Sequence, residues 1–341
     1  MFLTKPLGAI LGCFTVACNP AGLDANIVVK NHHQERRFVA IPFDTVLATH
    51  FSPRDTVLLD PSSLVADGTG IWVFDYGRLA LIKLGLDGQP LWSLGRSGGG
   101  PAEFRQVRDI ELAPGNAVAV LDPGTGRLTV VGPSGKVTKM IDIAFAGHAE
   151  QVAPISGGRF VLGSYSNTKP LVVIDSTGRL VDSLKVPWSD FSTLDPLSSQ
   201  YLLAANPVSG VWVMGLGLGS VFSVLHELTP IVQSASYVEW AVPPTPTVSK
   251  GEDGSVTTRM PPAETARNLV VTDSSIYVLF EGHPETAGRI IDVYDARSGR
   301  YRQSLRLPGR YIDFAVHAGI FYLITNEDGP NIIGLRLRAV H

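Results

Sequence analysis

The stretch from Val107 to Ile143 reads VRDIELAPGNAVAVLDPGTGRLTVVGPSGKVTKMIDI. It contains four short apolar segments, each bounded by glycine, proline or an Asp or Ser turn. These segments are residues 108–112, 117–122, 127–131 and 136–141. Short strands separated by tight turns favour an antiparallel meander, because glycine at a turn permits the chain to reverse within a few residues. One such four-stranded meander is the unit from which a β-propeller is built.

The second segment of this unit has counterparts along the rest of the chain. They are residues 71–75, 159–162, 211–214, 276–280 and 320–324. Their spacing is about 40 to 50 residues with one gap of about 65, which is in the range of propeller blades. Glycine turns at 87–88, 134–135, 177–178 and 298–299 fall where the outer hairpins are expected. The sequence therefore predicts an all-β, six-bladed β-propeller of four-stranded antiparallel blades, forming a single domain over residues 30–341.

The last unit, from Tyr311 to His341, has room for three strands only. Near the other end of the chain, Arg37–Ile41 is a strand candidate that belongs to no unit. We predict that this N-terminal strand completes the last blade and closes the ring, which also removes two exposed strand edges.

The first 25 residues have the features of an export segment. Lys5 precedes an apolar run from Leu7 to Ala17, and this run is too short to cross a bilayer comfortably. The tetrapeptide 15–18, Thr-Val-Ala-Cys, resembles a bacterial lipobox, except that the family pattern prefers Leu at its first position. This resemblance implies lipidation at Cys18, while cleavage near Ala25 and an uncleaved anchor remain alternatives. We expect an exported protein, tethered by its N-terminus at the periplasmic or outer face of a bacterial envelope.

Composition excludes several classes of function. The only cysteines, Cys13 and Cys18, lie in the export segment, so the folded body has no thiol for a disulfide, a Cys metal site or a nucleophile. A net charge of -3 gives no general attraction to nucleic acid. No nucleic-acid partner is therefore expected.

An insertion at about residues 241–266 accounts for the long gap between units four and five. Prolines flank a polar segment there, which favours an extended loop. Because loops often carry function, Pro243, Pro244 and Lys250 are candidate partner-binding residues. The alternative is a surface loop without a role.

The second unit resembles an NHL repeat. The matching positions are Ile110, Gly115, Asn116, Val118, Val120, Asp122, Arg127, Leu128, Val130 and Gly135. The linker 94–104, LGRSGGGPAEF, resembles that of bacterial six-bladed, NHL-like propeller proteins, with Ala102 where that family usually has glycine. Gly98–Gly100 lack the Lys-Ser/Thr ending of a phosphate loop. We expect the linker to be a blade crossing in which Phe104 packs and Glu103 pairs with Arg96.

The resemblance implies two enzyme models: gluconolactonase-like hydrolases with axial Glu, Asn and Asp around calcium, and streptogramin-lyase-like enzymes with an axial His and a divalent metal. The first strand of each propeller blade lines the channel, which gives a set of candidate channel groups. They are Asp109, Glu111, His148, Glu150, Asn268, Asp313 and His317. The Glu-Gly-Pro-x-Trp opening of the hydrolases is missing, and neither His148 nor His317 lies in a metal-ligand motif. No cofactor is expected, and calcium or magnesium at the channel is the alternative.

A small basic rim is expected from Arg96, Arg105 and Arg108, which are further candidate partner-binding residues. The sequence favours a non-catalytic binding propeller that engages a protein, peptide or glycan partner. A metal-dependent hydrolase or lyase and an accessory subunit of a membrane complex are the alternatives. Fold alone does not choose among them.

Overall fold

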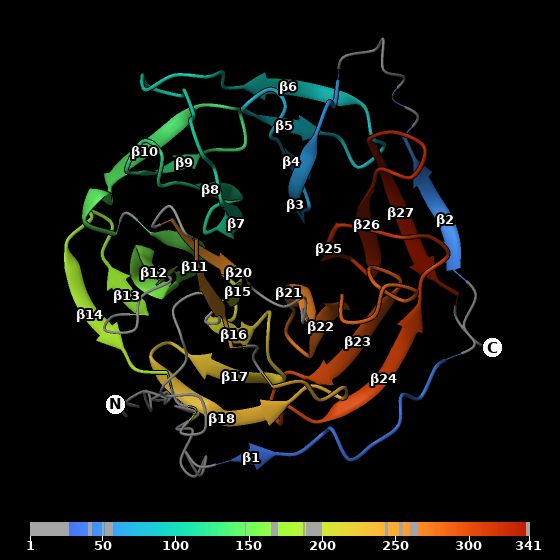
Figure 1. The fold of residues 1–341 in the computed structure, drawn as a ribbon. Coiled ribbons are helices and arrows are strands. Elements are labelled where there is room, and N and C mark those ends of the chain that lie inside the picture. Colours follow the sequence, from blue (N-terminus) through green and yellow to red (C-terminus); the bar gives the residue numbers. More distant parts are fainter. Residues whose placement is uncertain are drawn as a thin grey trace, which may run out of the picture.

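Six small antiparallel sheets surround a central axis and form a six-bladed β-propeller (Figure 1). The structure is a computed structural model that describes residues 27–39, 43–49, 51, 57–146, 148–164, 170–186, 188, 200–242, 245–251, 255–259 and 265–338. The export segment 1–25 with Cys18, as well as Pro243 and Pro244, lie outside the described residues. Within the described part, no helix is long and apolar enough to cross a bilayer.

The blades follow one another in chain order around the axis. From the axis outward, blade 1 is β3 (Pro61–Asp67), β4 (Gly70–Asp75), β5 (Ala80–Leu84) and β6 (Pro90–Leu94). In the same direction, blade 2 is β7 (Asp109–Ala113), β8 (Ala117–Asp122), β9 (Arg127–Val131) and β10 (Val137–Asp142). Blade 3 is β11 (Ala149–Ile155), β12 (Arg159–Ser164), β13 (Leu171–Ile174) and β14 (Leu180–Leu184).

Blade 4 is β15 (Tyr201–Asn206), β16 (Val211–Leu216), β17 (Val221–His226) and β18 (Thr229–Ser236), with β1 (Val28–Val29) added in parallel at its outer edge. Blade 5 is β21 (Ala266–Val271), β22 (Ser275–Phe280), β23 (Ile290–Asp295) and β24 (Tyr301–Arg306). Blade 6 is β25 (Asp313–His317), β26 (Ile320–Thr325), β27 (Asn331–Leu337) and β2 (Phe43–Ala48).

All six predicted second strands are present, as β4, β8, β12, β16, β22 and β26. They are almost completely buried because each blade packs between two neighbours, so both faces of a second strand meet apolar side chains. Trp72 in β4 and Trp212 in β16 are both inaccessible to solvent. This packing explains why these strands read as continuous apolar runs rather than as alternating ones.

The glycine turns of the outer hairpins also fit blades together. Gly178 has a φ of 89°, and a Cβ atom there would lie 2.8 Å from the backbone oxygen of Asp142 in the preceding blade. A Cβ atom at Gly135 would likewise lie too close to the side chain of Trp92 in blade 1. Glycine is therefore required at these turns both for the left-handed backbone and for the close approach of neighbouring blades.

The glycine-rich linker between blades 1 and 2 folds around Glu103. Its carboxylate accepts the backbone N–H of Gly100 at 2.6 Å and pairs with Arg96 at 2.7 Å. Phe104 is buried and meets Phe74 edge-on. Ala102 has a φ of 56°, the left-handed conformation that glycine adopts without strain. The predicted blade crossing and its Arg96–Glu103 pair are confirmed.

Closure of the ring by an N-terminal strand is confirmed, but the predicted strand was wrong. The strand that pairs with β27 is β2, and Thr45 lies opposite Leu335. Residues 37–39 of the predicted strand lie instead beside β24 of blade 5, where Phe38 forms a parallel bridge with Ser304. Both segments suit an extended conformation, so only the contacts of the folded ring distinguish them.

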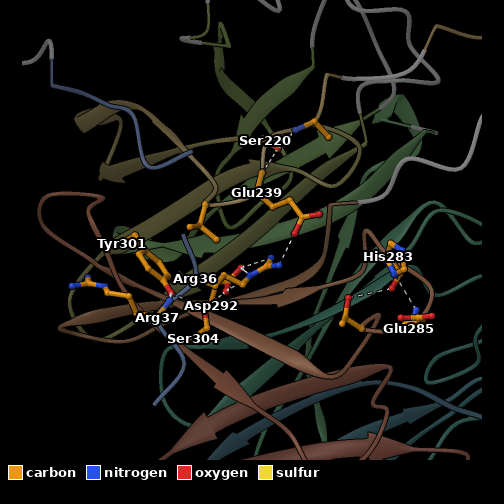
Figure 2. A network of polar contacts seen from close by, with 12 residues as sticks. Arg36, Arg37, Ser220, Glu239, His283, Glu285, Asp292, Tyr301 and Ser304 are labelled. Atoms are coloured by element: carbon orange, nitrogen blue, oxygen red, sulfur yellow. Dashed lines mark hydrogen bonds and ion pairs between the residues drawn. The ribbon is translucent and has the colours of Figure 1, made fainter. Parts of the chain in front are cut away.

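We call residues 27–39 the strap, because they run along the outer edges of blades 4 and 5. The side-chain amide of buried Asn31 donates to the backbone oxygens of Ser236 and Gly299, at 2.9 and 2.8 Å. Arg36 stacks on Phe280. Its guanidinium also forms ion pairs with Asp292 and Glu239 (Figure 2). The strap thus joins blades 4 and 5 before the chain enters blade 6 as β2.

The insertion after blade 4 is more than a loop. It contains an antiparallel hairpin of β19 (Thr247–Lys250) and β20 (Val256–Arg259), which pair with each other. Every residue of the two strands is exposed. Lys250 is one of these exposed residues.

Candidate functional site

A cavity of about 620 Å³ lies on the axis, surrounded by the inner strands of the blades. Figure 1 shows β7, β21 and β25 around the axis. Predicted polar residues of these strands, and the residue that precedes β7, line the cavity. The candidates that line it are Arg108, Asp109, Glu111, Asn268, Asp313 and His317. His148, Glu150, Arg96 and Arg105 do not line it. The inner strands therefore bring together some of the predicted site, but not all of it.

Asp313 connects blade 6 to blade 1. Its Oδ2 accepts the backbone N–H of Leu64 at 2.7 Å, and its Oδ1 accepts a hydrogen bond from Asn268 of blade 5. Inner strands have one edge toward the axis, where no further strand can satisfy their N–H groups. The carboxylate of the neighbouring blade takes this role. Asp313 and Asn268 thus act as contacts between consecutive blades.

The same arrangement joins blade 2 to blade 3 and blade 3 to blade 4. The Oδ2 of Asp109 in blade 2 accepts the N–H of Val152 in blade 3 at 2.8 Å. The Oε1 of Gln151 in blade 3 accepts the N–H of Leu203 in blade 4 at 3.2 Å. Sequence reasoning missed Gln151, although its place directly before the apolar residue of the inner strand matches that of Asp109. We call these three contacts, from Asp313, Asp109 and Gln151, the axial latches.

The acidic groups of the cavity are strongly perturbed. Burial raises the pKa of Asp313 to about 7, although the N–H of Leu64 favours the ionised form. Burial also raises the pKa of Asp109 and of Glu111, and the charge of Asp109 adds to the effect on Glu111. Glu111 has no ion-pair partner within the described residues. The cavity therefore favours protonated carboxyl groups, which donate as well as accept hydrogen bonds.

Arginines surround the end of the cavity where the inner strands begin. Arg108 pairs with Glu150 at 3.3 Å, and Arg267 pairs with Glu281 at 2.9 Å. The Nε of Arg267 also donates to the backbone oxygen of Ile312 at 2.6 Å, so these strand ends are neighbours. We call this end the arginine mouth. His317 lies at the opposite end, beside Gly68, and is far along β25 from the mouth.

The remaining predicted rim residues have structural contacts. Arg96 is held by Glu103, and Arg105 lies against Gly99 with its backbone N–H bonded to Asp122 at 2.9 Å. Across the described ranges, no group of three or more His, Cys, Asp or Glu side chains is arranged to hold a metal ion. His148 lies at the turn before β11, and Glu150, at the start of that strand, pairs with Arg108.

Solved structures with the same architecture are numerous. A protein of Bacteroides fragilis described as exported has a TM-score of 0.57 at 11% identity, with 92% of this chain and 99% of that chain covered. A member of the DUF4221 family from Bacteroides vulgatus has a TM-score of 0.56 at 11% identity, with 89% and 99% covered. The chain shares its fold with these two bacterial proteins.

An enzyme shares the same fold. The virginiamycin B lyase of Staphylococcus aureus has a TM-score of 0.54 at 11% identity, with 87% of this chain and 100% of that chain covered. No family model matches the sequence, and no curated protein is detectably similar to it. At such identities the likeness extends to the fold alone, since propellers carry many unrelated functions.

Proposed function

We propose that the protein is an exported, non-catalytic binding propeller that engages a protein, peptide or glycan partner at the cell envelope through the arginine mouth. The observation that carries this proposal is the use of Asp109 and Asp313 as axial latches. One oxygen of each carboxylate accepts a backbone N–H of the neighbouring blade, which gives both residues a structural role. Arg108 at the mouth, in contrast, is 41% exposed and has a single carboxylate partner.

The proposal is tested by site-specific photo-crosslinking in native membranes. A photoreactive residue at position 108 is expected to capture a discrete partner, whereas one at Arg179, an exposed arginine on the turn before β14, is not. Arg108→Ala should weaken capture of the same partner in an affinity pull-down, while Arg179→Ala should not. Equal labelling from both positions would contradict the assignment of the mouth. A captured integral membrane protein would identify the propeller as an accessory subunit.

A metal-dependent lyase or hydrolase is the second candidate, because Glu111 and His317 both line the cavity and neither is an axial latch. Elemental analysis of the purified full-length protein decides between the two. Stoichiometric calcium or magnesium, reduced by Glu111→Gln and accompanied by no captured partner, would replace the binding proposal. Metal-free protein that still captures a partner would support it.

A further inference from the structure

Glu111 is a carboxyl group in the axial cavity without a bond to another blade. Its side chain lines the cavity and has no hydrogen-bond or ion-pair partner on any other described strand. Burial raises the pKa of Glu111, and the charges of Asp109 and Asp313 raise it further. Burying a carboxyl group without a compensating contact disfavours the folded state. A perturbed acid of this kind in a cavity is typical of a binding site rather than of a support for the fold.

The layer of the cavity wall that contains Glu111 is otherwise apolar. In a strand, residues two positions apart point to the same side. Glu111 lies two positions after the latch residue Asp109, just as Ala315 lies two positions after the latch residue Asp313. The other residues of this layer that line the cavity are Val65 in β3, Ala204 in β15 and Val270 in β21. Glu111 is therefore a single ionisable group in a ring of small aliphatic side chains.

The size and lining of the cavity suit a small organic ligand. Its volume of about 620 Å³ is in the range of small-molecule pockets, which is about 300–1,000 Å³. The aliphatic ring around Glu111 provides a surface for an alkyl chain. The carboxyl group provides a partner for a polar group at the end of that chain. Because protein walls screen charges less than bulk water does, a positive nitrogen gains most from this partner.

The charges around the cavity favour a cation over an anion. The two arginines of the mouth, Arg108 and Arg267, have carboxylate partners that do not line the cavity, so they leave Glu111 uncompensated. Asp109 and Asp313 belong to the same cavity and are acidic as well. A positive ligand therefore lowers the repulsion among three carboxyl groups.

The end of the cavity opposite to the arginine mouth gives a cation a way in. The residues that line this end, at or just after the ends of β15, β21 and β25, include Asn206, Val208, Asp273 and His317. Val208 is 91% exposed, so the cavity reaches the surface here. Asp273 is exposed too, and its carboxylate accepts a hydrogen bond from Asn206 at 2.8 Å. No Lys or Arg lines this end among the described residues, so we call it the acidic end.

We propose that the axial cavity binds an alkylammonium group, which enters from the acidic end, places its nitrogen at Glu111 and lays its alkyl chain along the apolar layer. Any proton on Glu111 leaves to solvent when the ion pair forms, while the ammonium group keeps its three protons. Either a free amine or the lysine side chain of a peptide supplies such a group. This inference does not rest on the partner at the arginine mouth.

Isothermal titration calorimetry of the full-length protein tests the site with n-butylammonium as the probe. The probe should bind, whereas butanol and butyrate, which have the same chain without the positive charge, should bind at least about tenfold more weakly. Glu111→Gln keeps the shape of the side chain and should weaken binding of n-butylammonium at least about tenfold. The matched control is Glu285→Gln, which removes an exposed carboxylate between β22 and β23 and should leave binding unchanged.

A second probe, Nα-acetyl-lysine methylamide, identifies the source of the group. Tighter binding of this probe than of n-butylammonium indicates a lysine side chain of a peptide, and weaker binding indicates a free amine. Both results support an alkylammonium site, provided that Glu111→Gln abolishes the difference from butanol.

Equal binding of n-butylammonium to the wild type and to Glu111→Gln would overturn the proposal. So would equal binding of butanol and n-butylammonium to the wild type, or binding that requires added calcium. Glu111→Gln should be at least as stable in urea as the wild type, because it removes a buried carboxyl group that has no charged partner, so unfolding would not explain a loss of binding. None of these outcomes changes crosslinking at position 108, so the two proposals fail separately.

Discussion

Replacing Asp313 by Asn is predicted to remove part of the pH dependence of stability. The pKa of Asp313 is about 7 in the folded protein, against an ordinary value of 3.8, because the side chain is buried. Between these values the folded protein keeps a proton that the unfolded chain has lost, so stability falls as the pH rises. A pKa rise of about 3 corresponds to a loss of up to about 4 kcal/mol between pH 4 and pH 7.

Asn cannot ionise, but its side-chain oxygen can still accept the N–H of Leu64. The advantage of Asp313→Asn over the wild type should therefore grow by up to about 4 kcal/mol from pH 4.5 to pH 8. Urea denaturation followed by tryptophan fluorescence measures this difference. Asp313→Ala, which leaves Leu64 without an acceptor, should destabilise at every pH by about 1–3 kcal/mol. Parallel curves for the wild type and Asp313→Asn would refute the assignment of a raised pKa.

Three further substitutions test how the blades are joined, each by the free energy of unfolding in urea. Asp122→Ala should cost about 3 kcal/mol, because the buried carboxylate accepts the N–H groups of Arg105, Gln106 and Thr125. Asp122→Asn keeps one acceptor oxygen and should therefore cost less. Gly178→Ala should cost at least about 2 kcal/mol more than Gly115→Ala. Both glycines have a positive φ, but of the two only Gly178 has atoms within 4 Å of an added Cβ. Equal costs would show that the close approach is unimportant. Ala102→Gly should stabilise by about 1 kcal/mol, because it relieves the left-handed conformation, and a loss of stability would contradict this interpretation.

The hydrogen bonds of Asp122 and Asp75 explain why the second strands of blades 1 and 2 end in aspartate. Asp122 ends the second strand of the unit that resembles an NHL repeat. Its carboxylate accepts the backbone N–H groups of Arg105 and Gln106, which lie in the linker that leads into blade 2. Asp75 has the same place in blade 1 and accepts the N–H of Leu59 at 2.5 Å. Local signals of this kind are legible in a sequence because each depends on residues within one repeat or its linker.

The strands, turns and number of blades were determined by the sequence itself, since each blade carries its own apolar runs and a glycine such as Gly135 at its outer turn. The tertiary structure alone decided which N-terminal segment closes the ring. Leu47 of β2 packs against Gly334 of β27, where a Cβ atom would lie only 2.8 Å away, whereas Phe38 lies against blade 5. It also placed Asp109 and Asp313 where each accepts a backbone N–H of the neighbouring blade. Both outcomes depend on contacts between residues far apart in the chain, and the local sequence pattern does not specify such contacts.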